Sequence, residues 1–248
     1  MQVVGYDAGD GGLLLSQDGT VEYIDLTPGT ELAYALGDRH CAGTLHDGEH
    51  IACDADAAPY CDEHSHVWVC ARCTGDCLKD EMDCFDDHAV YLAAFAPDTF
   101  KIGVTKEWRL ETRLLEQGAD CAAHIRTVDD GRAARRIEAG IAERIPDRVR
   151  VPTKRQGLHK AVDDDAWTAL LAEFDPIETL EFDYGLSFSG QPMAETMAAG
   201  TVRGVKGRLL VLDRGGSTYA VDMRSLVGHE LSDGVDEREM QSSLGAFG

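Results

Sequence analysis

Lysine, aromatic side chains and long apolar segments are all scarce in this chain of 248 residues. Lysine occurs six times, and Phe, Trp and Tyr together make up 7% of the sequence. No segment approaches the roughly 18 consecutive apolar residues of a membrane-spanning helix. The first residues, MQVVGYDAGDGG, lack the basic start and apolar core of a signal peptide. We therefore expect a soluble cytoplasmic protein with no membrane partner.

Basic residues are outnumbered, since 45 acidic residues stand against 23 Lys and Arg and the net charge is −22. The acids are interleaved with apolar residues, which form 44% of the chain, so the pattern differs from that of a disordered acidic tail. A carboxylate-rich, lysine-poor surface keeps a protein hydrated in concentrated salt. The composition therefore predicts a folded, halophilic protein and says more about the solvent than about the partner.

Periodicity predicts an α+β fold made of a zinc-binding knuckle, a small α/β domain and a small β-rich module. Short alternating stretches with turn signals predict strands near both ends of the chain, and the first strands can pair with the last. The predicted segments are a β segment at 1–39, a zinc-binding region at 40–88, an α/β domain at 89–174, a β-rich module at 175–234 and a flexible tail at 235–248.

The middle segment alternates strands with helices. AVYLAAF and TFKIGV are apolar runs of strand length joined by a turn, and CAAHIRTV is a third predicted strand. Thr105 is expected to cap the first helix, which ends at Gly118. Asp129 or Asp130 begins a second helix that stops before Pro146.

Seven of the eight cysteines fall between residues 40 and 88, where apolar periodicity is weak. In a reducing cytoplasm such cysteines favour a metal over disulfides. C-x-x-H and C-x-x-C spacings let one tight turn present two side chains to a tetrahedral ion, and thiolates with imidazole favour Zn²⁺. The spacing predicts two closed structural zinc sites, and one division of the ligands is Cys41, Cys53, Cys61 and His64 for the first, then Cys70, Cys73, Cys77 and Cys84 for the second.

The pairing of these ligands stays open. His40, His46, His50 and His66 compete with His64, the two sites can be interleaved, and a single site with spare thiols is the main alternative. Cys121 stands apart at the edge of a predicted strand and is interpreted as a small buried apolar residue.

Two short motifs in the middle segment are separated by a hairpin. AVY at 89–91 is followed by KIG at 101–103, then by a helix with Arg113 and a later helix with Glu138. In order and spacing, residues 89–145 resemble the GIY-YIG nuclease superfamily, with KIG as in a branch of that superfamily. The resemblance implies two antiparallel strands that carry the two motifs, an Arg on the next helix and a metal-binding Glu on a later one.

The resemblance also implies a chemistry. Hydrolysis of a phosphodiester needs an in-line water, neutralisation of charge on the phosphate and a divalent ion. By resemblance Arg113 supports the phosphate, Glu138 holds one Mg²⁺ or Mn²⁺, and Tyr91 helps to position or deprotonate the nucleophile. Lys101 replaces the second motif's Tyr and is either a phosphate contact or, at a lowered pKa, a base. Arg109, one turn earlier, is an alternative to Arg113.

Each of these residues also has a purely structural interpretation. Tyr91 in an apolar strand is by default a core aromatic residue. Glu138 can form a solvent-exposed ion pair with Arg135, and Arg113 can pair with Glu116.

A basic segment interrupts the acidic chain at residues 125–160, where ten Lys and Arg face five acids. Such an excess predicts a nucleic-acid surface beside Glu138, and forked guanidinium groups keep directional phosphate bonds in screening salt. The alternative is that these residues pair with acids elsewhere in the chain. The candidate contacts are Arg132, Arg135, Arg136, Arg144, Arg148, Arg150, Lys154 and Arg155.

The last eight residues, QSSLGAFG, place Gln241, Leu244 and Phe247 three apart. This pattern resembles the box by which replication and repair proteins bind the sliding clamp, PCNA. One helical turn would present the Leu and Phe to an apolar groove while the Gln reaches a polar pocket. Chance spacing in a disordered end is the alternative.

Together these features predict a clamp-associated, metal-dependent, structure-selective DNA endonuclease of repair or replication, associated with the nucleoid of a high-salt cytoplasm. The alternative is a non-catalytic zinc-dependent adaptor that binds DNA or RNA, and Lys101 is the feature that favours it.

Overall fold

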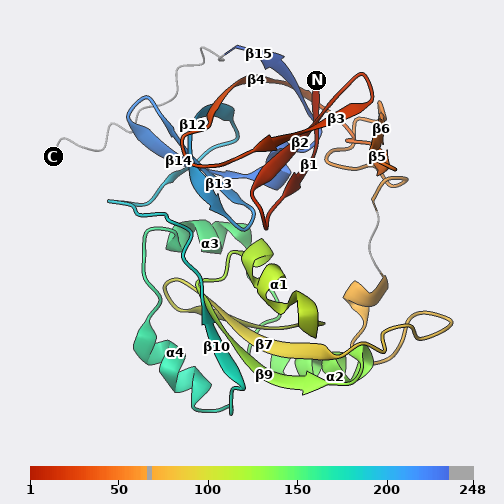
Figure 1. Cartoon of the computed structure of the whole chain (residues 1–248), viewed down its shortest axis with the longest axis vertical. Coiled ribbons are helices and arrows are strands. Elements are labelled where there is room, and N and C mark those ends of the chain that lie inside the picture. Colours follow the sequence, from red (N-terminus) through yellow and green to blue (C-terminus); the bar gives the residue numbers. More distant parts are fainter. Residues whose placement is uncertain (66–68, 235–248) are drawn as a thin grey trace.

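A computed structural model describes residues 1–65 and 69–234. Figure 1 shows two units, a β-rich unit built from both ends of the chain and an α/β unit built from its middle. Within the described residues, the β-rich unit contains one sheet of eleven strands in the order β11-β14-β13-β12-β4-β15-β1-β2-β3-β6-β5. Its elements are β1 (Gln2–Asp7), β2 (Gly12–Gln17), β3 (Thr20–Asp25), β4 (Glu31–Arg39), β5 (Thr44–His46), β6 (Glu49–Ile51), β11 (Met193–Ala194), β12 (Ala198–Lys206), β13 (Leu209–Arg214), β14 (Ser217–Asp222), α5 (Met223–Leu226) and β15 (His229–Asp233).

Strand β4 joins the two ends of the chain, because it pairs with β12 on one side and with β15 on the other. The β2–β3 hairpin turns at Asp18 and Gly19, which both have positive φ, as the sequence Asp-Gly favours. Leu13 and Leu15 of β2 are buried in one core with Leu210 and Leu212 of β13. The first and last segments of the chain therefore share a sheet and a core.

The α/β unit contains a four-stranded antiparallel sheet in the order β10-β9-β7-β8. Its elements, with the preceding turn of 3-10 helix, are η1 (Val69–Arg72), β7 (His88–Phe95), β8 (Thr99–Lys106), η2 (Glu107–Arg109), α1 (Leu110–Gln117), β9 (Cys121–Val128), α2 (Gly131–Ala142), α3 (Val151–Gly157), α4 (Asp164–Leu171) and β10 (Glu178–Glu181). None of the described helices is long and apolar enough to cross a membrane.

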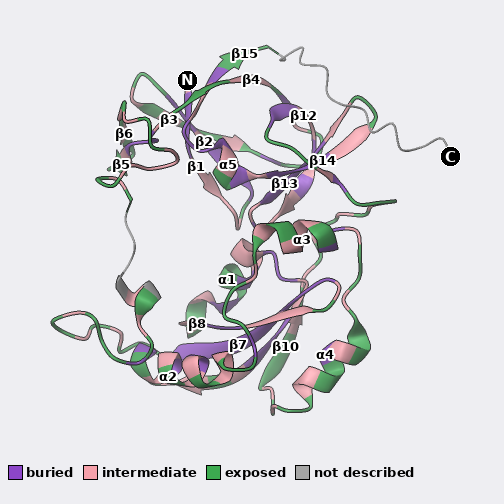
Figure 2. Ribbon diagram, turned by 180° about the vertical axis from the view of Figure 1, so that it is seen from behind, coloured by how far each residue is buried: buried purple, intermediate pink, exposed green. Residues whose placement is uncertain are grey.

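Strand β7 is apolar along nearly its whole length because both of its faces are covered. Tyr91 and Phe95 pack with Leu114 of α1, whereas Leu92 faces the opposite way and packs with Trp167 of α4. Figure 2 shows β7 as buried along its length. This explains why its sequence is a continuous apolar run rather than an alternating one.

The helix boundaries depend on local capping. Asp130 caps α2 by accepting a hydrogen bond from Ala133 N at 2.7 Å, which confirms the predicted start. Gly118 ends α1 in the left-handed region at φ 68°, as predicted. The prediction for Thr105 is wrong, because this residue still belongs to β8 and the helix begins after Lys106 without a side-chain cap.

Two predicted segment boundaries shift in the structure. Residues 178–181 form β10, which pairs with β9 of the α/β unit and so lies outside the β-rich module expected to begin at residue 175. The region 40–88 also contributes the β5–β6 hairpin to the larger sheet. Cys121 is partly buried and packs against the apolar core of the α/β unit, and burial raises its thiol pKa to about 12, in agreement with its interpretation as an apolar residue.

The two units touch where two glycines meet. A Cβ at Gly207, in the β12–β13 turn, would lie 2.5 Å from Gly118 N, so side chains at this position would separate the units. Lys206 forms an ion pair with Asp120, and Tyr184 Oη donates to Ala119 O at 2.9 Å. This contact holds the C-terminal end of α1 against the β-rich unit.

Candidate functional site

Four of the predicted zinc ligands converge beside the larger sheet. Cys41 follows β4, Cys53 follows β6, and Cys61 and His64 share a turn closed by a 3.0 Å hydrogen bond from His64 N to Cys61 O. His64 Nδ1 lies 3.4 Å from Cys41 Sγ and 3.2 Å from Cys61 Sγ, and Cys53 Sγ lies 4.0 Å from Cys61 Sγ. All four ligand atoms lie within 4.8 Å of one another. This cluster could hold a metal ion, and a closed Cys₃His set is typical of structural zinc.

Three of the histidines that compete with His64 have other partners. His40 Nε2 lies 2.9 Å from Glu230 Oε1, a contact that raises the pKa of His40. His50 bonds to a serine hydroxyl at 2.8 Å and to a backbone carbonyl at 3.0 Å, and His46 lies 3.3 Å from the carboxylate of its neighbour. His66 lies outside the described residues.

The second predicted set does not converge in the same way. Cys70, Cys73, Cys77 and Cys84 all line one cavity of about 630 Å³ beside α2. Among residues 1–65 and 69–234, however, the first set is the one group of three or more Cys, His, Asp and Glu whose ligand atoms lie within 4.8 Å. Cys77 is exposed, whereas the other three are partly buried.

His88 is a polar residue of this cavity that sequence reasoning missed. It is 9% exposed at the start of β7, and its Nδ1 donates to Asp86 O at 2.7 Å, so Nε2 is the ring nitrogen left for another partner. A Cβ at Gly131 would lie 2.9 Å from His88 Nε2 and 3.1 Å from Cys84 Sγ, so the two groups border the same space. The spacing Cys84-x-x-x-His88 was the signal in the sequence.

Tyr91 lies inside the α/β unit with its hydroxyl toward polar groups. It pairs with Gly103 of β8, where a Cβ would lie 2.5 Å from the Tyr91 hydroxyl, so glycine leaves the space that the ring needs. Gln117 Nε2 donates to Tyr91 Oη at 2.7 Å. Burial raises the pKa of Tyr91, against the opposing effects of the Gln117 hydrogen bond and the Arg113 charge.

Lys101 lies beside Tyr91, with Nζ 5.8 Å from the centroid of the tyrosine ring. Burial and, to a lesser degree, the charge of Arg113 lower the pKa of Lys101 to about 8, against the opposing charge of Glu138. The same two charges act on Tyr91. The four residues that the GIY-YIG resemblance selects are thus electrostatic neighbours in the folded chain.

The arginines and glutamates of this group form ion pairs among themselves. Arg113 and Arg109 both bind Glu116, at 2.9 Å and 2.7 Å, so the structure does not choose between them. Arg135 binds Glu138 Oε2 at 2.7 Å. Glu138 is 9% exposed, so this pair is buried at its acidic end rather than solvated.

The basic segment does not form one continuous face. Arg132 and Arg135 line the cavity beside the second cysteine set. Arg150, Lys154 and Arg155 line a different cavity, where α3 meets the β-rich unit. Arg113 contributes to both cavities.

Other members of the basic segment have structural contacts. Arg144 pairs with Glu173 at 2.7 Å, and Arg148 lies 3.7 Å from Asp147. A Cβ at Gly75 would lie 2.1 Å from Arg136 Cγ, which shows that the cysteine-rich loop packs on α2.

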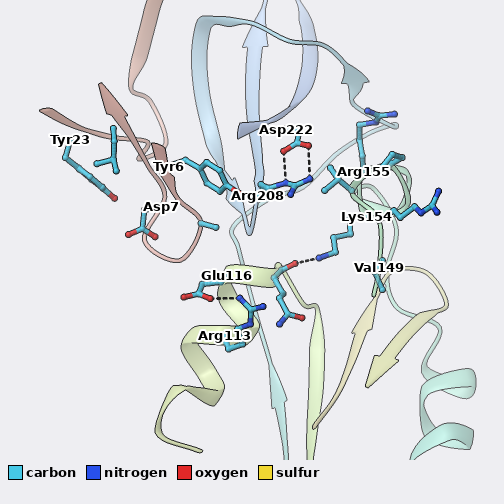
Figure 3. Close-up of a pocket in the computed structure, with 16 residues that line it drawn as sticks. Tyr6, Asp7, Tyr23, Arg113, Glu116, Val149, Lys154, Arg155, Arg208 and Asp222 are labelled. Atoms are coloured by element: carbon cyan, nitrogen blue, oxygen red, sulfur yellow. Dashed lines mark hydrogen bonds and ion pairs between the residues drawn. The ribbon is translucent and has the colours of Figure 1, made fainter. Parts of the chain in front are cut away.

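The larger of these cavities has a volume of about 990 Å³ and lies between the two units (Figure 3). Lys154 and Arg155 of α3 lie on one side of it, and Tyr6, Asp7 and Tyr23 of the β-rich unit lie on the other. Its lining also includes Arg208 of the β12–β13 turn, beside Asp222. The predicted clamp-binding residues, Gln241, Leu244 and Phe247, lie outside the described residues.

These features define an α+β protein with a Cys₃His cluster and a group of neighbouring ionisable residues in its α/β unit. The sequence profile of a family described as Protein of unknown function (DUF2797) matches residues 31–231, so the chain belongs to this family. Comparisons with curated proteins and with solved structures found no match.

Proposed function

We propose that the protein is a metal-dependent nuclease that cleaves a phosphodiester in branched, nicked or otherwise unusual DNA. The observation that carries this proposal is the gathering of Tyr91, Lys101, Arg113 and Glu138 around the middle of the β7–β8 hairpin. Sequence order alone does not require four such residues, drawn from two strands and two helices, to be neighbours. A Tyr, a Lys, an Arg and a Glu are also the residue types that phosphodiester hydrolysis uses.

Lys101 takes the role of general base in this proposal. With its pKa lowered to about 8, a useful fraction of the amine is neutral near pH 7 and accepts the proton of the attacking water. The water oxygen bonds to phosphorus while the bond from phosphorus to the leaving oxygen breaks. Tyr91 orients the water through its hydroxyl, and Arg113 or Arg109 exchanges its Glu116 contact for the phosphate oxygens.

Glu138 fits the requirement for a divalent ion. Its Oε2 is bound to Arg135, and among the described residues Oε1 has no hydrogen-bond partner. One carboxylate suits Mg²⁺, which keeps most of its waters and takes further oxygens from a phosphate. When bound, the ion would stabilise negative charge on the leaving oxygen.

We also propose zinc as the metal of both cysteine regions. The converged set is a closed Cys₃His site with no position for a substrate, so its role is structural. For the second region we propose Cys70, Cys73, Cys84 and His88 as ligands, with Cys77 outside the set. The His88 ring is buried and is oriented by a hydrogen bond to a backbone carbonyl, as zinc-binding histidines commonly are. Cys77, in contrast, is exposed.

The second candidate function is a non-catalytic adaptor that binds nucleic acid. The observation that favours it is that Arg109, Arg113 and Glu138 all have ion-pair partners already. The same surface would then bind DNA or RNA without cleaving it.

Glu138→Gln tests the choice between the two. With Mg²⁺ or Mn²⁺ at high KCl, we expect cleavage of branched or nicked DNA to fall by at least about a hundredfold, while DNA binding stays within about twofold. Glu173→Gln is the matched control, because it neutralises a glutamate of an exposed ion pair and should cleave like wild type. Wild-type inactivity across DNA and RNA substrates, with binding retained, would establish the adaptor instead.

Association with the sliding clamp is proposed from the sequence of the tail. Phe247→Ala should abolish clamp pull-down because it removes the terminal apolar anchor. Ser243→Ala, between the anchor positions, is the control. Equal capture of both variants and wild type would reject the clamp interaction.

A further inference from the structure

The cavity between the two units holds more positive charge than its own acids neutralise. Of its acids, Glu116 is bound to Arg113 and Asp222 is bound to Arg208 by two contacts of 2.7 Å and 2.9 Å. Asp7 accepts hydrogen bonds from two backbone amides of the following turn. Each acid of this cavity therefore already has an ion-pair or hydrogen-bond partner.

Three further cations of the cavity, Arg150, Lys154 and Arg155, have no carboxylate partner among the described residues. The chain carries a net charge of −22, so acidic partners are abundant elsewhere on its surface. Three unpaired cations on one wall of a cavity of about 990 Å³ are therefore an arrangement that favours an anionic ligand.

Lys154 shows this charge imbalance most clearly. Its Nζ donates to Gln117 O at 2.7 Å and lies 4.3 Å from the centroid of the Phe95 ring. Burial, together with the nearby charges of Lys101 and Arg208, lowers its pKa to about 7. A bound anion would supply the negative charge that this ammonium group lacks.

The opposite wall is aromatic. Tyr6 and Tyr23 face the cavity from β1 and β3, and a Cβ at Gly12 would lie 2.1 Å from Tyr23 Cζ, so the ring lies directly over β2. The side-chain oxygen of Gln117, on the α1 side, is buried and has no hydrogen-bond partner in the part of the chain that the structure describes. The cavity thus offers cations, an aromatic surface and a free acceptor for an N–H or O–H donor.

We propose that this cavity binds a nucleoside phosphate, with the phosphate at Lys154, Arg155 and Arg150 and the base beside Tyr6 and Tyr23. The ligand is either a free nucleotide or the phosphorylated end of a nucleic-acid strand, which present the same chemistry. The site goes beyond the proposed cleavage reaction, since Lys154 and the two tyrosines have no part in that mechanism.

Binding of AMP to the full-length protein, measured by calorimetry in chloride buffer, tests the site. Lys154→Met keeps the length of the side chain over Phe95 but removes the charge, and it should weaken AMP binding at least about tenfold. Lys160→Met is the matched control, because Lys160 is exposed and lies outside the cavity, and it should bind like wild type. Thermal unfolding of both variants verifies that they fold.

Other probes identify the ligand's source. Adenosine should bind more weakly than AMP, and inorganic phosphate should compete with AMP, because the phosphate provides most of the charge-assisted contacts. A 5′-phosphorylated oligonucleotide that displaces AMP, while its unphosphorylated form does not, assigns the site to strand ends; failure of both assigns it to free nucleotides.

The proposal is overturned if wild type binds neither AMP nor the phosphorylated oligonucleotide. It is also overturned if Lys154→Met and Lys160→Met weaken binding equally. Neither outcome depends on DNA cleavage, so the cavity and the nuclease proposal fail or stand separately.

Discussion

The two cysteine regions have similar spacings in the sequence, yet only the first brings its ligand atoms within 4.8 Å of one another among the described residues. Cys41 and Cys53 each follow a strand of the eleven-stranded sheet, which fixes where their side chains begin. Cys70 to Cys84 lie on a loop whose regular structure, in the part described, is the short η1 turn. The set whose first two ligands are positioned by the sheet converges, whereas the set carried by the loop does not.

This difference gives the largest expected effect. Cys61→Ser should remove one zinc per chain and lower the free energy of unfolding by about 5 kcal/mol or more, because zinc binding to structural sites corresponds to roughly 10–16 kcal/mol. Metal analysis and thermal unfolding provide the measurement. Cys121→Ser changes a thiol that is not a ligand and should keep the full zinc content. A Cys61→Ser protein with unchanged zinc would rule out the first site.

In the α/β unit, the next largest effect should be on activity. Lys101→Met removes the proposed base, so the cleavage rate should fall by about 10²–10⁴-fold. The wild-type rate should rise with pH up to about 8, because the neutral amine is the active form. A wild-type rate that falls over this range would contradict the role of Lys101 as base.

The same substitution should have the opposite effect on stability. The folded-state pKa of Lys101, about 8, lies below its unfolded value of 10.5, so the charged form opposes folding. Wild-type stability should therefore rise between pH 8 and 10.5 from this residue alone. Lys101→Met should be the more stable protein below pH 8, and this advantage should disappear above pH 10.5. Equal stability at pH 7 in chemical denaturation would contradict the lowered pKa.

The zinc content of two variants should identify the ligands of the second cysteine region. We expect His88→Asn to lower the zinc content from two ions per chain to one, and Cys77→Ser to keep two. The loss of stability should be smaller than for Cys61→Ser, because the loop is not part of the larger sheet. The reverse result, with zinc lost in Cys77→Ser and kept in His88→Asn, would restore the four-cysteine set.

The smallest structural effect is expected at Trp108. This ring is 75% exposed beside Arg109 on the rim of the second cavity, so Trp108→Ala should change stability by no more than about 0.5 kcal/mol. If nucleic acid binds here, the loss of base stacking should weaken binding by about 1–3 kcal/mol. Binding that is unchanged in a fluorescence titration would place the nucleic acid elsewhere.

Local signals predicted much of the α/β unit. The apolar runs located β7, β8 and β9, and Asp130 and Gly118 marked helix ends, because capping and periodicity act within a few residues. The predicted helix cap at Thr105 was wrong because Thr105 pairs with Ala89, which extends β8 past a residue that could also have begun a helix. Tertiary pairing outweighed the local preference.

The sequence by itself determined the types of ligand, the spacing of the first Cys₃His set and the order of the catalytic candidates. Only the tertiary structure decided that β10 joins the smaller sheet, that His88 borders the same space as Cys84, and that the basic segment divides between two cavities. The physical reason is the distance along the chain over which each signal acts. Periodicity, capping and chelate spacing are properties of neighbouring residues, whereas a cavity between two units depends on how Gly118 meets Gly207, and no local pattern records that contact.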